Sequence, residues 1–442
     1  MNKTVYPGSV WGRVDIPASK SQTIHALLIA LFAKGKSIIT NPLFCADTEV
    51  CMSFCRALGA KVYFCEAKSA TEEESGQGNK DEGMLVVDSS ELNPVKDLVV
   101  DCRSSGTTLY FATALSCSLG VRVRFTGDRS LGSMPAKALL GSLKDLGADV
   151  DLVEGVPYCV RGPLRGGHTS IRCMMGPHLN ALLLACPLCQ SDTTIDVHLL
   201  REKAGVRTTE IWLEKQGINF FRDRDMRHYT IRGGQVYKPL EADINGDFSL
   251  AAFFFCAAAI TGMTITIGHL DCNSSQADRA ILDILTKMGC NVRVEGHSVT
   301  LTGPSRLKAV DMDLGETPDL ITPLAVTASF ASGPVRMSNV SHGMMRGLRE
   351  RSSAIAQCIN SVGGRVQDLG DSLVVYPVEV FGENSCSNGS AVVKGFDDPR
   401  VAMAMAIAAL RSANGITIEN SECVDQTYPR FFEQFQSVVV GR

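Results

Sequence analysis

The sequence has no excess of basic residues. Its 442 residues include 43 lysines and arginines against 47 aspartates and glutamates, so the formal net charge is −4 at pH 7. Proteins that bind nucleic acids usually carry a clear basic surplus, because phosphate contacts dominate their affinity. We therefore expect no nucleic-acid partner.

Long apolar segments are also lacking. The longest apolar run, Leu250 to Ile260, is far shorter than the roughly 20 residues that a membrane-spanning helix needs. The N-terminal segment MNKTVYPGSVWGRVD contains no hydrophobic stretch of the signal-peptide kind. We expect neither a membrane partner nor export by that route.

Metal-ligand patterns are missing too. The sixteen cysteines are scattered, many of them in apolar runs. Cys51 with Cys55 and Cys186 with Cys189 are closely spaced, but neither pair has a second pair at zinc spacing. We interpret the cysteines as reduced core thiols of a cytoplasmic protein, and we predict no metal.

What the chain does contain is an internal repeat. A small-residue apolar run, an alternating strand, a polar segment and a helical pattern ending in glycine recur along the sequence, and a sixth copy closes it. The glycines lie where a helix end needs a left-handed residue: Gly59, Gly147, Gly217, Gly289 and Gly363. Their spacings are 88, 70, 72 and 74 residues. The long first spacing contains an acidic, polar insert, Glu66 to Gly83, which predicts a surface loop.

Polar residues precede several predicted apolar helices. Lys20 and Ser21 lie at a strand-to-helix turn in IPASKSQTIHALL, where the positive end of a helix suits phosphate or carboxylate. The alternative is structural, with Ser19 or Ser21 capping the helix and Lys20 solvated.

Three further helix starts have the same character. Ser104–Thr108 joins a flexible Gly106 to hydroxyl groups that can cradle an anion, or merely cap a helix. Asp319, before an apolar stretch, is either a cap or a functional carboxylate. Asp398 and Arg400 precede VAMAMAIAAL, and an arginine at a helix start opposes the helix dipole unless an anion binds there.

Taken together, these segments resemble the enolpyruvyl transferase family, most closely its EPSP synthase branch. The resemblance covers essentially the whole chain. Its most specific stretches are Pro17–Leu28, Ser105–Thr108, Gly246–Ser249, Thr317–Asp319, Asp398–Met403 and Tyr428–Phe432.

The resemblance implies a fold and a reaction. The fold is α/β: a two-domain inside-out α/β barrel of six βαβαββ repeat units, three per domain, with buried helices and a cleft that closes on substrate. The expected domains are residues 1–19 with 235–442, and residues 20–234. The reaction transfers the enolpyruvyl group of phosphoenolpyruvate to the 5-hydroxyl of shikimate 3-phosphate, with no cofactor. A monomer is expected, because the fold closes within one chain.

Matched positions carry the family's roles onto this chain. Lys20 corresponds to a lysine that contacts both substrates, and Ser21 to a serine at the shikimate phosphate. Gly106 and Thr107 correspond to a loop against phosphoenolpyruvate.

The remaining roles fall in the C-terminal half. Asp319 corresponds to the general base, and Arg351 and Arg400 to arginines on phosphoenolpyruvate. Glu350 is the expected second acid, although the register of Arg346 to Arg351 is open.

The chain departs from the family at several of these positions. His25 stands where the family has arginine, Met134 replaces another arginine, and Gln426 replaces a lysine. Met175-Gly176-Pro177 replaces the Ser-Ser-Gln that holds the shikimate phosphate. A protonated His25 would bind that phosphate more tightly as the pH falls from 8 to about 6, since its unperturbed pKa is about 6.5. Cations at other positions are candidates to compensate: Arg129, Arg172, His178 and Arg207.

Three readings stay open at this point. The chain is a working EPSP synthase with a divergent site, or it shares the fold but has weak or no activity and a binding or regulatory role. The third reading is a carboxyvinyl transferase acting on a sugar nucleotide. Members of that branch usually have asparagine after the first lysine and a cysteine in the closing loop, whereas here Ser21 follows Lys20 and residues 127–137 contain no cysteine.

Overall fold

The computed structural model describes residues 1–66, 83–92, 96–132, 134–173, 176–200, 203–340, 346–382 and 389–441. Nearly all of the predicted surface loop, residues 67–82, lies outside these ranges. No helix within them combines the length and apolar character needed to cross a bilayer.

The chain folds as two compact units. Unit 1 contains Met1–Pro17 and Asn245–Arg442, and unit 2 contains Ala18–Ile244. The chain therefore returns to unit 1 at Asn245, where the sequence had suggested 235. The reason is strand β15 (Glu241–Asp243), which pairs in parallel with β4 of unit 2.

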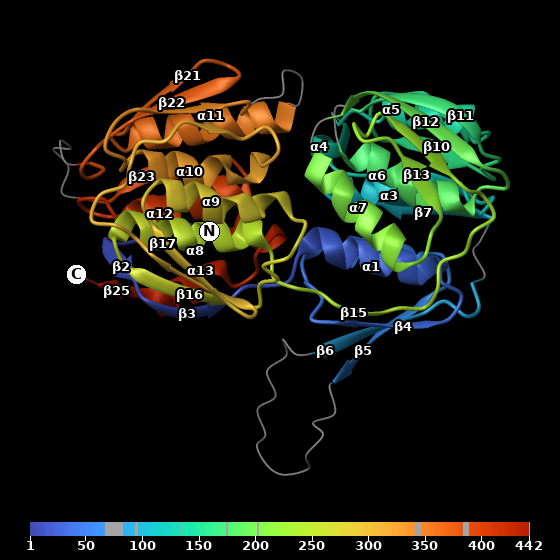
Figure 1. Cartoon of the computed structure of the whole chain (residues 1–442), viewed down its shortest axis with the longest axis horizontal. Coiled ribbons are helices and arrows are strands. Elements are labelled where there is room, and N and C mark those ends of the chain that lie inside the picture. Colours follow the sequence, from blue (N-terminus) through green and yellow to red (C-terminus); the bar gives the residue numbers. More distant parts are fainter. Residues whose placement is uncertain are drawn as a thin grey trace, which may run out of the picture. The chain divides into compact units, whose positions relative to one another are not determined.

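Unit 2 holds the first three repeats (Figure 1). The first repeat comprises α1 Lys20–Phe32, β4 Lys36–Thr40, α2 Ala46–Ala57, β5 Lys61–Glu66 and β6 Gly83–Asp88. The second comprises β7 Asp97–Asp101, α3 Gly106–Ser116, β8 Arg122–Thr126, α4 Arg129–Gly132, α5 Lys137–Asp145, β9 Asp149–Val150 and β10 Tyr158–Arg161. The third comprises β11 Gly167–Cys173, α6 Gly176–Ala185, η1 Cys186–Leu188, β12 Thr193–Leu200, α7 Lys203–Lys215, β13 Phe220–Arg222 and β14 His228–Ile231.

Unit 1 holds the other three repeats and the N-terminal strands β1 Lys3–Val5, β2 Gly8–Val10 and β3 Gly12–Asp15. The fourth repeat comprises α8 Phe248–Thr261, β16 Thr264–Gly268, η2 Ala277–Arg279, α9 Ala280–Lys287, β17 Asn291–Glu295 and β18 Ser298–Thr302. The fifth comprises β19 Met312–Asp313, η3 Pro318–Leu320, α10 Ile321–Ala328, β20 Val335–Ser338, α11 Arg346–Ser361, β21 Arg365–Asp368 and β22 Ser372–Tyr376. The sixth comprises β23 Ala391–Lys394, α12 Pro399–Ala409, β24 Ile416–Glu419, η4 Ser421–Gln426, α13 Phe431–Val438 and β25 Val439–Gly441.

The four-stranded sheets repeat one strand order. In β7-β8-β10-β9, β11-β12-β14-β13 and β19-β20-β22-β21, one outer pair is parallel and the other pairs are antiparallel. A buried helix makes the crossover that a parallel pair requires. In the first and fourth repeats, the strand that completes this pattern comes from a distant part of the sequence. β15 pairs with β4, and β3 pairs with β16. The α/β architecture of six repeats, three per unit, is confirmed.

Each repeat contributes one helix that is apolar on nearly every side. In α8, all residues from Phe248 to Ile260 are buried, and in α12 nine of ten residues from Pro399 to Ala408 are. A helix that is hydrophobic all round belongs in a core. In unit 1, α8, α10 and α12 pack against one another, and in unit 2, α3 packs against both α1 and α6 (Figure 1). The predicted arrangement of helices inside and sheets outside is thus confirmed within each unit.

The predicted helix-ending glycines adopt left-handed conformations. Their φ angles are +98°, +102°, +71°, +103° and +87° at Gly59, Gly147, Gly217, Gly289 and Gly363. Because a side chain at such a φ is strained, each glycine fixes where its outer helix ends and the next strand begins.

The core of unit 1 yields a stability prediction. Phe254 is fully buried in α8, and its ring lies 5.9–6.2 Å from those of Tyr428, Phe431 and Phe435. Phe254→Ala should lower the free energy of unfolding by about 3–5 kcal/mol, because it removes buried area and leaves a cavity. Urea denaturation would measure the change. Phe221→Ala, at a ring that is 63% exposed, is the matched control and should cost less than about 1 kcal/mol.

Candidate functional site

In unit 2, the predicted anion site lies where three helices begin. Lys20 starts α1, and its Nζ forms an ion pair with Asp47 Oδ2 in the first turn of α2 at 2.8 Å. Ser19 stands at the N-cap position but makes no side-chain cap bond, and Ser21 is exposed. The capping alternative for these two serines is therefore not what the structure shows.

The start of α3 adjoins the same place. Thr108 Oγ1 donates to the main-chain oxygen of Asp47 at 3.5 Å and accepts from Ser105 Oγ at 3.0 Å. Ser105 leaves the first amides of α3 without a side-chain cap. Gly106 and Thr107 are both half-buried here. Uncapped amides at a helix start are donors to an anion.

The structure also locates most of the residues at which the sequence was expected to depart from the family. A Cβ placed on Gly106 would come within 2.7 Å of Met134 Cε, so the methionine that replaces an arginine lies against this helix start. Met175 lies outside the described residues, whereas Gly176 opens α6 and is buried. Gln426 ends η4 of unit 1 and is exposed.

The expectation that His25 binds phosphate as a cation is wrong in this structure. The ring is 1% exposed, with Nδ1 at 2.7 Å from Ser21 O and Nε2 at 2.8 Å from Thr209 Oγ1. It packs against Phe111 and Trp212. Burial lowers the pKa of His25 to about 4, so the ring is neutral between pH 6 and 8. It is a packing residue.

Two of the residues proposed to replace the missing cations, His178 and Arg207, have other roles in the structure. Burial lowers the pKa of His178 to about 4, and its ring meets Tyr110 edge-on at 4.5 Å. Arg207 forms ion pairs with Glu210 at 2.9 Å and Glu214 at 2.7 Å. Arg129 and Arg172 are exposed.

In unit 1, the predicted residues meet in a compact charged group. Asp319 Oδ1 accepts from Arg351 Nη1 at 3.0 Å, and Asp319 Oδ2 accepts from Arg400 Nη2 at 2.6 Å. Arg351 Nε donates to Asp398 Oδ2 at 2.7 Å. We call Asp319, Arg351, Asp398 and Arg400 the arginine cluster. All four side chains are between 12% and 31% exposed.

Electrostatics favour the charged forms of Asp398 and Arg351. Burial acts to raise the pKa of Asp398, but the charge and hydrogen bond of Arg351, with Arg400 beside it, outweigh burial and leave that pKa below its usual value. Burial likewise acts against the charge of Arg351, yet Asp398 and Asp319 raise its pKa further. Two fixed guanidinium groups, one in the first turn of α12 and one in the second turn of α11, are well suited to bind a carboxylate or phosphate.

Two helices in this unit are capped by carboxylates. Asp398 Oδ1 accepts from the main-chain amide of Arg400 at 2.8 Å and so caps α12, while Asp247 caps α8 through the amide of Ser249. Glu350 adjoins Arg351 on α11 and is exposed, and it takes no part in the bonds of the arginine cluster. The side chains of residues 346–349 lie outside the described ones.

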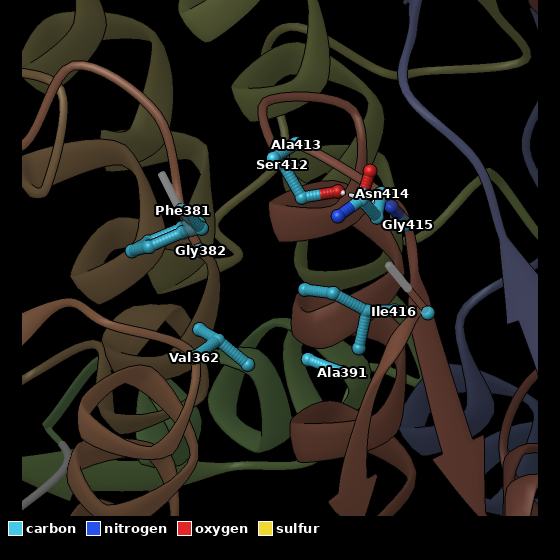
Figure 2. Close-up of a pocket in the computed structure, with 10 residues that line it drawn as sticks. Val362, Phe381, Gly382, Ala391, Ser412, Ala413, Asn414, Gly415 and Ile416 are labelled. Carbon is cyan, nitrogen blue, oxygen red and sulfur yellow. Dashed lines mark hydrogen bonds between the residues drawn. The ribbon is translucent and has the colours of Figure 1, made fainter. Parts of the chain in front are cut away.

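A small pocket elsewhere in unit 1 contains none of the predicted site residues. Val362, Phe381, Ala391 and Ile416 line it together with the turn from Ser412 to Gly415, where Ser412 Oγ accepts from the amide of Gly415 at 3.0 Å (Figure 2). Its lining carries no charged side chain. Among the described residues there is also no group of three histidines, cysteines or carboxylates arranged as metal ligands.

Comparison with known proteins first defines the class. A solved structure of EPSP synthase from Acinetobacter baumannii matches with a TM-score of 0.79 at 20% sequence identity, covering 99% of this chain and 98% of that one. This likeness shows that the chain has the two-unit α/β fold of that structure.

Sequence comparison then gives the family. The family model for EPSP synthase (3-phosphoshikimate 1-carboxyvinyltransferase) matches residues 6–435. Proteins named 3-phosphoshikimate 1-carboxyvinyltransferase are similar along their whole length. That of Ruminiclostridium cellulolyticum is 32% identical over 98% of this chain and 97% of its own. That of Methanocella arvoryzae is 35% identical, with coverages of 96% and 95%. The chain belongs to the EPSP synthase family.

Sequence reasoning missed one acidic residue of these sites. Asp47, the partner of Lys20, lies in the first turn of α2. A carboxylate at a helix start is so often a cap or a dipole partner that the pattern alone does not single it out.

The buried His25 generates a prediction for stability. Its pKa in the folded chain, about 4, lies below the unfolded value of 6.5. Folding therefore favours the neutral ring, and stability present above pH 6.5 is lost as the pH falls towards 4, by about 3 kcal/mol in all. His25→Gln should flatten this loss, as measured by urea denaturation at pH 7.5, 5.5 and 4.5.

Between pH 8 and 7, the free energy of unfolding should change equally in the wild type and in His25→Gln. A variant that loses stability on acidification as steeply as the wild type would contradict the neutral assignment. His178→Gln is the matched comparison, because burial lowers the pKa of that ring to the same value.

Proposed function

We propose that this chain catalyses the EPSP synthase reaction, with the residues above in the family's roles. The enolpyruvyl group of phosphoenolpyruvate passes to the 5-hydroxyl of shikimate 3-phosphate, and phosphate leaves. The observation that carries the proposal is the arginine cluster, in which Asp319 is held between two guanidinium groups at 3.0 and 2.6 Å. The family model that matches residues 6–435 supports shikimate 3-phosphate and phosphoenolpyruvate as the anions that these charged residues bind.

Asp319 is the proposed base. In the addition step, the 5-hydroxyl oxygen bonds to C2 of phosphoenolpyruvate, its proton goes to a carboxylate, and C3 gains a proton. In the elimination step, C3 gives up a proton and the bond between C2 and the phosphate oxygen breaks. A positioned carboxylate that accepts and returns protons typically contributes a factor of about 10²–10⁴ to such reactions.

Arg351 and Arg400 are the proposed ligands of phosphoenolpyruvate. Both guanidinium groups bind Asp319 in the structure. A bound carboxylate or phosphate would compete for the same donors, and charge-assisted bonds of this kind are about twice as strong as neutral ones. Substrate binding would thereby loosen the hold on Asp319 and leave its oxygens available for proton transfer. Glu350 remains proposed as a second acid.

In unit 2, we propose that Lys20 and Ser21 bind shikimate 3-phosphate, with Lys20 also contacting phosphoenolpyruvate. Gly106 and Thr107 would receive phosphoenolpyruvate on the uncapped amides of α3. On substrate binding, the ion pair of Lys20 with Asp47 would be replaced by one with a substrate anion. The ion pairs of Arg351 and Arg400 with Asp319 would be replaced in the same way.

We also propose a cytoplasmic monomer that needs no cofactor. The described cysteines are all unpaired thiols, and most are buried, which suits a reducing compartment. Size-exclusion chromatography with light scattering tests the monomer.

The direct test is turnover. The purified chain, incubated with both substrates, should release phosphate in step with formation of the enolpyruvyl ether. Binding of shikimate 3-phosphate without phosphate release would favour the reading that the chain has a binding or regulatory role.

Lys20→Ala should reduce kcat/KM by about 10²-fold or more without unfolding the chain. Each lost charged hydrogen bond is worth about 1.5–3 kcal/mol, and two substrates lose a contact. Phosphate-release kinetics measure the loss, with Lys144→Ala on an exposed face of α5 as the control. A rate close to that of the wild type would show that the anion site at α1 is wrong.

Asp319→Asn should lower kcat by about 10²–10⁴-fold, because the amide cannot take up a proton. KM for phosphoenolpyruvate should not rise, since Arg351 and Arg400 lose a competing anion. Steady-state kinetics separate the two parameters. A large rise in KM with kcat preserved would make Asp319 a structural partner of the arginines rather than the base.

A further inference from the structure

Arg103 is an exposed cation near the start of α3 that has no role in the site described above. It lies in the turn between β7 and α3, three residues before Gly106, and its φ angle is +48°. A residue with a side chain is uncommon at such a φ and persists there only where the surrounding structure holds it. Arginine therefore carries a conformational cost at this position that glycine would not.

Hydrogen bonds hold the main chain of this turn on both sides. The amide of Arg103 donates to Asp101 Oδ1 at 3.0 Å, and Arg103 O accepts from the amide of Asp128 at 2.9 Å. The amide of Ser105 donates to Cys102 O at 2.8 Å. Asp128 lies in the loop between β8 and α4. The backbone of Arg103 is thus fixed against both the start of α3 and that loop.

The guanidinium group of Arg103 lies at the first turn of α2. Its Nη1 is 4.0 Å from Glu49 Oε2, and both side chains are 63% exposed. The same turn contains Asp47, which pairs with Lys20 and accepts from Thr108 of α3 through its main-chain oxygen. Arg103 therefore places a positive charge beside the helix starts that form the candidate anion site of unit 2.

This guanidinium group is available to a ligand. Within the described residues, Glu49 is its one ion-pair partner, and their separation of 4.0 Å is longer than a hydrogen bond. Exposed ion pairs contribute little, so their separation costs little. Arg207, by contrast, is held by two carboxylates at 2.9 and 2.7 Å. The five N–H donors of an arginine match a carboxylate or phosphate better than one distant glutamate oxygen does.

Met134 leaves a lack of positive charge at the same helix start. It stands where the family has an arginine, and its Cε would lie 2.7 Å from a Cβ placed on Gly106. A thioether offers no charge and no donor to an anion at the uncapped amides of α3. The bond from the amide of Asp128 to Arg103 O joins the turn of Arg103 to the loop that leads to Met134.

We propose that Arg103 supplies the guanidinium group that Met134 does not, and that it binds an anionic group of phosphoenolpyruvate beside the uncapped amides of α3. Its ion pair with Glu49 is replaced by one with the substrate. This role rests on the proposed function, in which Gly106 and Thr107 receive the same substrate. The conformational cost of arginine in this turn is offset by the substrate contact that it provides.

The first experiment removes the side chain and measures KM and kcat separately. Arg103→Gly should raise KM for phosphoenolpyruvate tenfold or more, with kcat and KM for shikimate 3-phosphate within about threefold of the wild type. Arg103→Lys, which keeps the charge, should lose less. Arg124→Ala, at an exposed residue of β8, is the control and should change neither parameter. An unchanged KM for phosphoenolpyruvate in Arg103→Gly would overturn the proposal.

Stability separates substrate binding from a structural role. Glycine adopts a φ of +48° without strain, whereas alanine does not. Arg103→Gly should therefore unfold at a urea concentration no lower than Arg103→Ala, although both lose affinity for phosphoenolpyruvate. A Gly variant that binds as tightly as the wild type while only the Ala variant is impaired would make Arg103 a structural residue and overturn the proposal.

The second experiment tests the replacement of one arginine by another. In a Met134→Arg background, the family's arginine is restored beside Gly106. Arg103→Gly should then raise KM for phosphoenolpyruvate by threefold or less, because the substrate keeps one guanidinium group. An equal rise in both backgrounds would show that the two positions do not serve the same anion, and would overturn the replacement.

The failure of this proposal and that of the proposed function are distinguishable. Should the wild type release no phosphate, calorimetric titration of phosphoenolpyruvate in the presence of shikimate 3-phosphate takes the place of kinetics. Binding that is tenfold weaker in Arg103→Gly would refute the transferase function and support Arg103 as an anion ligand. Equal affinities, or a wild type that binds no phosphoenolpyruvate, would overturn the role of Arg103 as well.

Discussion

The structure depends on the burial of wholly apolar helices at the centre of each unit. A helix such as α8, buried from Phe248 to Ile260, leaves its first amides with no partner within the helix. These amides must be satisfied by caps or ligands at the helix start, so polar residues concentrate there. Lys20, Gly106 and Asp319 all lie at such starts. The candidate site of each unit is thus a consequence of how the core of that unit is built.

The same constraint explains why the site contains so many acids. Helix starts attract carboxylates, and in unit 1 Asp247 and Asp398 both act as caps. Arg351 and Arg400 lie among these acids, and between them they bind Asp319 and Asp398. The arginines are consequently held in place before substrate arrives, which lowers the ordering cost of binding an anion.

Much of this could be predicted from residue patterns, and the exceptions have physical causes. The repeat, the helix-ending glycines and the helix starts at Lys20 and Asp319 follow from local rules of turn and cap chemistry. The return to unit 1 was placed too early, because strand β15 is three residues long and its pairing with β4 joins segments about 200 residues apart. His25 was misjudged because burial sets its charge, and burial depends on Trp212 and Phe111 from other helices.

The departures from the family in unit 2 change how an anion can be held there. With His25 neutral, Lys20 is the one cation among the residues of unit 2 that were matched to the family's substrate-binding roles. The ends of helices α1 and α3 each contribute about half a positive charge through their free amides. Every substitution except proline keeps these main-chain donors. Under the proposed function, affinity in unit 2 rests on backbone geometry, which Gly106 makes accessible, and on whether Lys20 exchanges Asp47 for the substrate.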